Sequence, residues 1–110
     1  MQISYDEAMR TNVRVGHTVA NVYRRFSYFE EKAGLRFEVP PAWTGDGDAL
    51  IAIFRFPSGH FAALGTRRQM FERGVELLCA SMETEPDVLS AFRSAFPELQ
   101  EEEIFSREKW

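Results

Sequence analysis

The sequence predicts an α+β fold in the order α-β-β-β-α-α: a long N-terminal helix, a three-stranded antiparallel β-meander and two C-terminal helices. Three observations lead to this prediction. Apolar residues recur at spacings of three and four over the first third of the chain. They alternate or form short runs between residues 35 and 65, and the helical spacing returns after residue 66. With 110 residues, the chain has the length of a single domain.

The first helix is expected over residues 4–33. Ser4 and Glu7 have the spacing of a capping box at its start, and Gly34 is placed to end it in the left-handed conformation. Between these ends runs an apolar seam with one polar member: Tyr5, Ala8, Asn12, Val15, Val19, Val22, Phe26, Phe29 and Ala33. The middle is the weakest part, because it holds several β-branched residues and Gly16.

The length of this helix predicts a partner. At 1.5 Å per residue it would be about 43 Å long, whereas a compact domain of this size is roughly 34 Å across. Either the helix breaks near Gly16, or its seam continues against another chain. A lone polar seam residue sets register in coiled coils, so a homodimer through this helix would use Asn12, Val15, Val19 and Val22.

The sheet is expected over residues 35–65. Residues 35–39 alternate apolar and charged side chains, as a half-exposed strand does. Residues 49–56 are apolar on both faces except at one arginine, which is typical of a central strand. Residues 57–59 have the composition of a turn, and residues 60–65 return as the third strand.

Two helices are expected over residues 66–100. Thr66 to Gln69 has the spacing of a second capping box, and Thr84, followed by Glu85 and Pro86, begins the last helix. Residues 101–110 then form an acidic tail.

Composition excludes several classes of protein. The chain is 45% hydrophobic and 27% charged, which is typical of soluble globular proteins. It has no apolar run of about 20 residues, so we expect no membrane span and a cytoplasmic location. The single cysteine, Cys79, forms no internal disulfide. One cysteine and two histidines make too few ligands for a zinc site, so we expect no metal and no cofactor.

The strongest candidate for a ligand site is the start of the second predicted helix. Thr66, Arg67 and Arg68 would place a hydroxyl and two guanidinium groups beside a helix N-terminus, which binds phosphates and carboxylates. The spacing of a nucleotide P-loop is absent. Small-ligand or nucleotide-phosphate binding is therefore the alternative function, and arginines that are solvated or paired with acidic residues are the structural alternative.

Other constellations are less specific. Asp46 and Asp48 lie in a glycine-rich loop, but no later acid completes a calcium loop. Cys79, His17 and His60 could form a nucleophile with its base, but no sequence motif brings them together. We therefore assign no catalytic residue.

Charge and aromatic residues lead to the main functional prediction. The net charge is −4, and the final 28 residues hold eight acidic but only three basic residues, which argues against direct nucleic-acid binding. Tryptophans at 43 and 110 and Phe105 belong to no apolar stripe. The candidate partner-binding residues are Glu101, Glu102, Glu103, Phe105, Trp110 and Trp43.

We therefore predict a small acidic inhibitor that occupies a macromolecular surface, of the immunity-protein or phage anti-defence type. Its partner would be a protein with a basic, nucleic-acid-binding surface. Eleven of the thirteen basic residues are arginine, a bias typical of GC-rich bacterial or phage genomes. A secretion-type chaperone is a further alternative, by analogy of size and charge alone.

Overall fold

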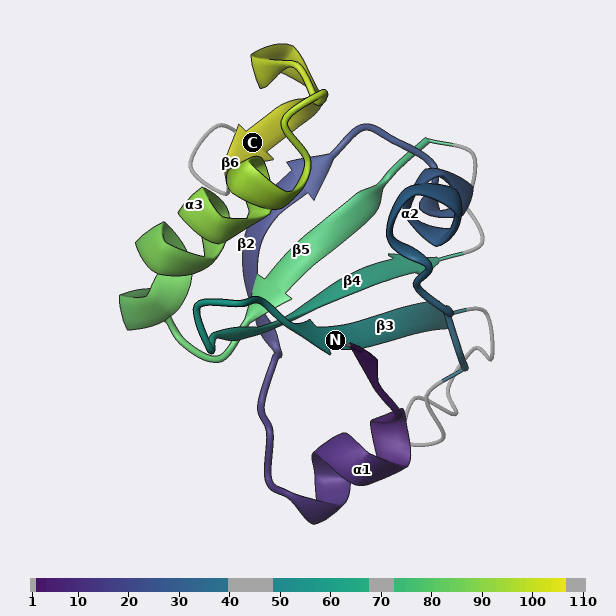
Figure 1. Cartoon of the computed structure of the whole chain (residues 1–110), viewed down its shortest axis with the longest axis vertical. Coiled ribbons are helices and arrows are strands. Elements are labelled where there is room, and N and C mark those ends of the chain that lie inside the picture. Colours follow the sequence, from purple (N-terminus) through teal and green to yellow (C-terminus); the bar gives the residue numbers. More distant parts are fainter. Residues whose placement is uncertain (1, 40–48, 68–72, 107–110) are drawn as a thin grey trace.

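A computed structural model of the chain describes residues 2–39, 49–67 and 73–106. Its centre is an antiparallel sheet in the order β1-β3-β4-β5-β2-β6, and every pairing in it is antiparallel (Figure 1). The strands are β1 (Gln2–Ile3), β2 (His17–Val22), β3 (Ala49–Arg55), β4 (Phe61–Arg67), β5 (Val75–Cys79) and β6 (Ile104–Ser106). The helices are α1 (Tyr5–Arg10), α2 (Phe26–Ala33) and α3 (Glu85–Ala95), with short 3-10 turns η2 (Met82–Thr84) and η3 (Glu101–Glu103).

The predicted helix over residues 4–33 is wrong, although both of its ends are confirmed. Ser4 Oγ accepts a hydrogen bond from the Glu7 backbone N–H at 3.1 Å, and Gly34 adopts a φ of 67°. Between these ends the chain leaves the helix after Arg10, and Asn12 turns it with a φ of 59°. The β-branched residues that follow then form β2, where branched side chains fit better than in a helix.

The predicted helical seam disappears with this helix. Asn12 is a turn residue, while Val15 is buried under α1. Val19 and Val22 lie in β2, between β5 and β6, and are only 3% and 0% exposed. These four residues therefore offer no exposed helical seam through which two copies could pair.

The three-stranded meander is also wrong. Its second and third strands exist as the β3–β4 hairpin, but residues 35–39 contribute only an isolated bridge from Glu38 to Ile51. The predicted second helix is replaced by the end of β4 and by β5. β5 lies between β4 and β2, and its only polar residue is Glu76, so its short and largely buried apolar run shows no clear alternation.

The last helix forms at its predicted start and ends earlier than expected. α3 begins at Glu85 with proline in its first turn, ends at Ala95, and buries Val88 and Phe92. The chain thus combines helices with an antiparallel sheet, but their order differs from the prediction. Among the described helices, none is long and apolar enough to cross a membrane.

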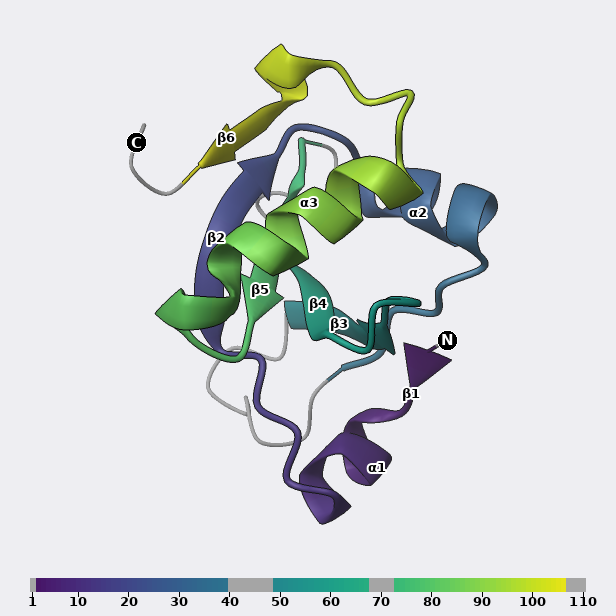
Figure 2. The ribbon, with the colours of Figure 1, turned by 60° about the vertical axis from the view of Figure 1, so that its left-hand side comes forward.

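The two faces of the sheet are covered differently. On one face, α2 and α3 pack over the strands and enclose a core centred on Phe29, Phe92 and Phe96 (Figure 2). On the other face, α1 forms a smaller core in which Tyr5 and Ala8 join residues of β3, β4 and β5. α1 stands at one end of the molecule, apart from α2 and α3 (Figure 1).

Side chains from the N-terminal segment and residues 34–39 hold α1 in place. The Gln2 carboxamide donates to the Arg36 carbonyl at 2.5 Å and accepts from the Arg36 N–H at 2.7 Å. The Glu38 carboxylate accepts from the Tyr5 N–H at 3.1 Å, at the start of α1. A carboxylate at this position stabilises a helix N-terminus.

Candidate functional site

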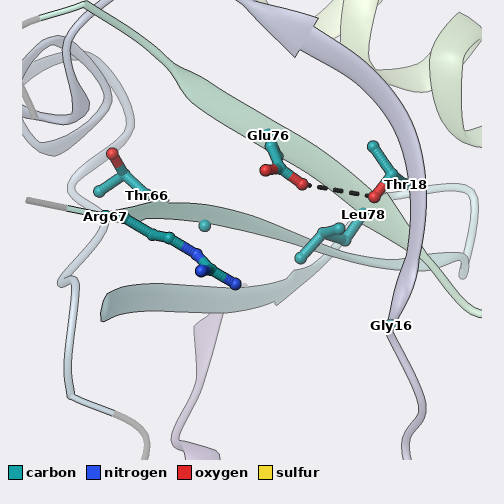
Figure 3. A pocket seen from close by; sticks show the side chains of 7 residues that line it. Gly16, Thr18, Thr66, Arg67, Glu76 and Leu78 are labelled. Atoms are coloured by element: carbon teal, nitrogen blue, oxygen red, sulfur yellow. Dashed lines mark hydrogen bonds between the residues drawn. The ribbon is translucent and has the colours of Figure 1, made fainter. Parts of the chain in front are cut away.

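A pocket of about 240 Å³ opens on the face of the sheet that carries α1, where β2, β4 and β5 run side by side (Figure 3). We call it the polar pocket. It is lined by Gly16, Thr18, Gly65, Thr66, Arg67, Glu76 and Leu78. Strand register brings these distant residues together, because β5 pairs Leu78 with Thr18 of β2 and Glu76 with Gly65 of β4.

Charged groups of opposite sign line the polar pocket. The half-buried Glu76 carboxylate accepts a hydrogen bond from the Thr18 hydroxyl at 3.3 Å. The exposed Arg67 side chain extends from the end of β4 across the pocket, below Glu76 (Figure 3). Within the described parts of the chain, the Arg67 guanidinium forms no ion pair with Glu76 or any other acid. Two opposite charges thus line this pocket without pairing with each other.

Asn21 adds a buried acceptor next to this pocket. Its Cα lies opposite that of Glu76 in the β2–β5 ladder, and opposite residues of an antiparallel pair share one face of the sheet. Asn21 is only 6% exposed, and its Oδ1 accepts no hydrogen bond from the residues that the structure describes. A buried acceptor that has no donor among the described residues is unfavourable for stability.

The glycines separate into two groups. A Cβ on Gly74 would lie 2.4 Å from the Val22 carbonyl oxygen, and Gly34 and Gly59 have left-handed backbones with φ of 67° and 96°. These three positions require glycine. A Cβ on Gly65 would make only ordinary contacts, 3.5 Å from Leu78 Cδ1, and one on Gly16 would meet nothing within 4 Å. Neither position has a left-handed backbone, and both line the polar pocket.

The helix on which the predicted anion site depended does not form, and anion binding by these residues stays a prediction. Thr66 and Arg67 lie in β4, so no helix N-terminus stands beside them. The buried Thr66 hydroxyl donates to the Gly74 carbonyl at 3.0 Å and is not free for a ligand. Arg67 does line a pocket, but at a strand end, and Arg68 lies outside the described residues.

Those predicted partner-binding residues that the structure describes lie in η3 and β6. Glu103 forms a two-point contact with Arg24, at 2.5 Å to Nε and 3.0 Å to Nη2, while Glu102 is exposed. Glu101 belongs to η3, and Phe105 pairs with Asn21 in the backbone register of β6 and β2. Trp43 and Trp110 lie outside the described residues. Binding of a partner by this region stays a prediction.

The Arg24–Glu103 pair belongs to a polar cluster that attaches the C-terminal segment to the chain between β2 and α2. The hydrogen bond from Arg24, helped by one from the Gln100 N–H, lowers the pKa of Glu103. The Tyr28 phenol, which lies under the Arg24 guanidinium, donates to the Glu98 carboxylate. Burial, together with this bond, raises the pKa of Tyr28 to about 12, so Tyr28 remains a donor at neutral pH.

The structure shows how the candidate nucleophile Cys79 and the two histidines, His17 and His60, are placed. His17 lies opposite Cys79 in the β2–β5 register, and its Nε2 is 2.7 Å from the Glu85 carboxylate. Cys79 has no exposed surface, and its thiol donates to the Ser81 carbonyl at 3.1 Å. His60 lies instead beside Asp87, at 3.7 Å. Because the thiol is fully buried, this histidine–cysteine pair offers no accessible nucleophile.

The described residues contain no group of three or more potential metal ligands. Searches against protein-family models, curated proteins and solved structures found no match to this chain. The geometry of the polar pocket is therefore the basis for a functional proposal.

The sequence pointed to Thr66 and Arg67 of this pocket but not to Thr18 and Glu76, nor to Asn21 on the same face of the sheet. One signal was present: Gly65 interrupts an apolar strand, and such a glycine often marks a close approach of a ligand or another backbone. The other signals depend on which strands are neighbours, and this cannot be read along the chain.

Proposed function

We propose that this protein binds a small polar molecule reversibly in the polar pocket. The observation that carries the proposal is the pair of glycines at 16 and 65. Neither backbone conformation nor neighbouring atoms require a glycine at either position, yet both leave space in the same pocket. A glycine inside a strand weakens that strand. Gly65 lies inside β4 although nothing around it requires a glycine, so the space that it leaves in the pocket best explains it.

The polar groups support the same proposal. Binding sites combine apolar walls with a few convergent polar groups, and here Leu78 provides an apolar wall beside a carboxylate, a hydroxyl and a guanidinium. A volume of about 240 Å³ corresponds to roughly eight water molecules at about 30 Å³ each, which fits a small metabolite.

The inhibitor predicted from charge and aromatic residues is the less supported function. Of its acidic candidates, Glu103 is bound to Arg24. Three more acids of the same region, Glu85, Asp87 and Glu98, also contact side chains of this chain. These contacts reduce the acidic surface available to a basic partner.

The test is a titration followed by heteronuclear amide NMR. The probes are L-alanine, ethylamine, propionate, inorganic phosphate and glycerol, each at millimolar concentration. We expect at least one probe to shift the amide signals of Thr18, Gly65 and Glu76 selectively. If no probe does so, the proposed function is overturned.

A graded substitution shows whether the response comes from the pocket itself. Gly65→Ala should weaken binding and Gly65→Val should weaken it further, because each side chain fills more of the pocket. Ser90→Val is the control, since it adds bulk at an exposed position of α3 that does not line the pocket. Equal binding by the wild type and Gly65→Val would place the ligand elsewhere and contradict the proposal.

A further inference from the structure

We infer that the ligand of the polar pocket is a small amino acid, which carries a primary ammonium and a carboxylate on one short skeleton. The inference rests on the proposed function and identifies the ligand class for that site. Its basis is that acceptors gather on one side of the pocket and a guanidinium reaches across from the other (Figure 3).

Glu76 and Thr18 form the acceptor side of the pocket, and Asn21 lies on the same face of the sheet but is not among the residues that line the pocket. The carboxylate of Glu76 has two oxygens, and the Thr18 hydroxyl points its proton at one of them, so its own lone pairs remain free. Asn21 Oδ1 is buried, has no donor among the described residues and lies on the same face, opposite Glu76. A primary ammonium has three N–H donors and no acceptor, so it matches the Glu76 carboxylate and the Thr18 hydroxyl, and the proposal assigns its third N–H to Asn21 Oδ1.

The opposite side is formed by Arg67. Its guanidinium presents N–H donors in a planar fork that binds a carboxylate through two parallel hydrogen bonds. Arg67 has no ion-pair partner in the described residues, although Glu76 lines the same pocket. Because Arg67 and Glu76 line one pocket without forming an ion pair, a molecule that carries both a carboxylate and an ammonium can contact both side chains.

The same charges disfavour other ligand classes. A phosphate or nucleotide would bring additional negative charge towards Glu76, and a simple amine would leave Arg67 unmatched. The limited volume and the wall formed by Leu78 favour an amino acid with a short aliphatic side chain.

The decisive measurement is calorimetric titration with three related probes. L-alanine carries both charges, ethylamine lacks the carboxylate, and propionate lacks the ammonium. We expect L-alanine to bind at least about tenfold more tightly than either analogue, because each analogue leaves a charged group of the site unmatched. Propionate, ethylamine or phosphate binding as tightly as L-alanine would overturn the amino-acid assignment but leave the proposed function standing.

Two variants separate the roles of the charges. Glu76→Gln should remove most of the preference for L-alanine over propionate and leave its preference over ethylamine. Arg67→Ala should remove most of the preference for L-alanine over ethylamine and leave its preference over propionate. Glu102→Gln and Arg36→Ala change exposed charges outside the pocket and should leave both preferences unchanged. Retention of both preferences in the pocket variants would contradict the assigned contacts.

Asn21→Leu provides an independent test. Leucine has nearly the same shape but no acceptor, so L-alanine should bind several-fold more weakly to a protein that remains folded, as its amide spectrum will show. Unchanged binding by this variant would remove Asn21 from the recognition of the ammonium. Loss of all selective shifts with every probe in the wild type would instead reject the proposed function itself.

Discussion

The two faces of the sheet differ in how completely they are covered. Under α2 and α3, side chains from five strands and two helices form a continuous apolar core (Figure 2). On the opposite face, the core under α1 is smaller, and beside it lie a carboxylate, a guanidinium and a buried amide without a donor. The covered face stabilises the fold, whereas the other face leaves polar groups available for binding.

Strand β5 contributes side chains both to the apolar core and to the polar pocket. Val75, Leu77 and Cys79 of β5 point into the core under α2 and α3. Glu76 and Leu78, which alternate with them, line the polar pocket. Because side chains of a strand alternate between faces, a substitution on one face can leave the other largely intact.

The largest effect should come from opening the covered face. Phe92 is fully buried and contacts the rings of Phe29 and Phe96, so Phe92→Ala should lower the free energy of unfolding by about 3–5 kcal/mol. Phe61→Ala removes an equal volume from a half-buried ring on the other face and should have less than half this effect. Urea unfolding of both variants measures the contrast, and equal losses would contradict it.

A smaller effect should distinguish the required glycines from the unforced ones. Gly74→Ala would force a Cβ to within 2.4 Å of the Val22 carbonyl oxygen and should cost more than about 1 kcal/mol of stability. Gly65→Ala makes only ordinary contacts and should leave stability unchanged or raise it by up to about 1 kcal/mol. Thermal unfolding of the two variants is the measurement, and a Gly65→Ala loss equal to that of Gly74→Ala would refute the distinction.

The smallest effect concerns the contact between Arg24 and Glu103. The pKa of Glu103 is lowered in the folded state, so the unfolded chain binds its proton first as the pH falls below about 4.5. The stabilisation is therefore present at neutral pH and is lost in acid. Glu103→Gln should cost up to about 1 kcal/mol at pH 7, since the pair is partly exposed.

The corresponding measurement is urea unfolding at neutral and acidic pH. The difference between wild type and Glu103→Gln should shrink as the pH approaches 3, where the wild-type carboxyl also becomes protonated. A constant difference across this range would show that the carboxylate charge contributes nothing to the contact.

Local features of the fold could be predicted from the sequence because they depend on neighbouring residues. The Ser4 cap, the left-handed Gly34 and the start of α3 are determined by side chains and backbone preferences within one turn of the chain. The β3–β4 hairpin likewise follows from two apolar runs around a short turn. Of the residues that line the polar pocket, Thr66 and Arg67 were identified as candidates.

Tertiary structure decided the conformation of β2 and β5. The apolar spacing of Val15, Val19 and Val22 fits a helix, yet the chain forms β2 because β5 and β6 pair with its two edges. For β5, burial on both faces removes the alternation that marks an exposed strand. The stabilisation of a strand by its neighbours depends on residues far away along the chain, so it cannot be predicted from the local spacing of apolar residues.

The polar pocket likewise depends on pairing between strands that are distant along the chain. Thr18, Arg67 and Glu76 lie on three different strands, and only the register of β2, β5 and β4 brings them to one face. A shift of one residue in either pairing would turn the affected side chains to the other face. The sequence by itself thus determined the caps, the hairpin and the last helix, while the site depends on strand register, which is set by the packing of the whole sheet.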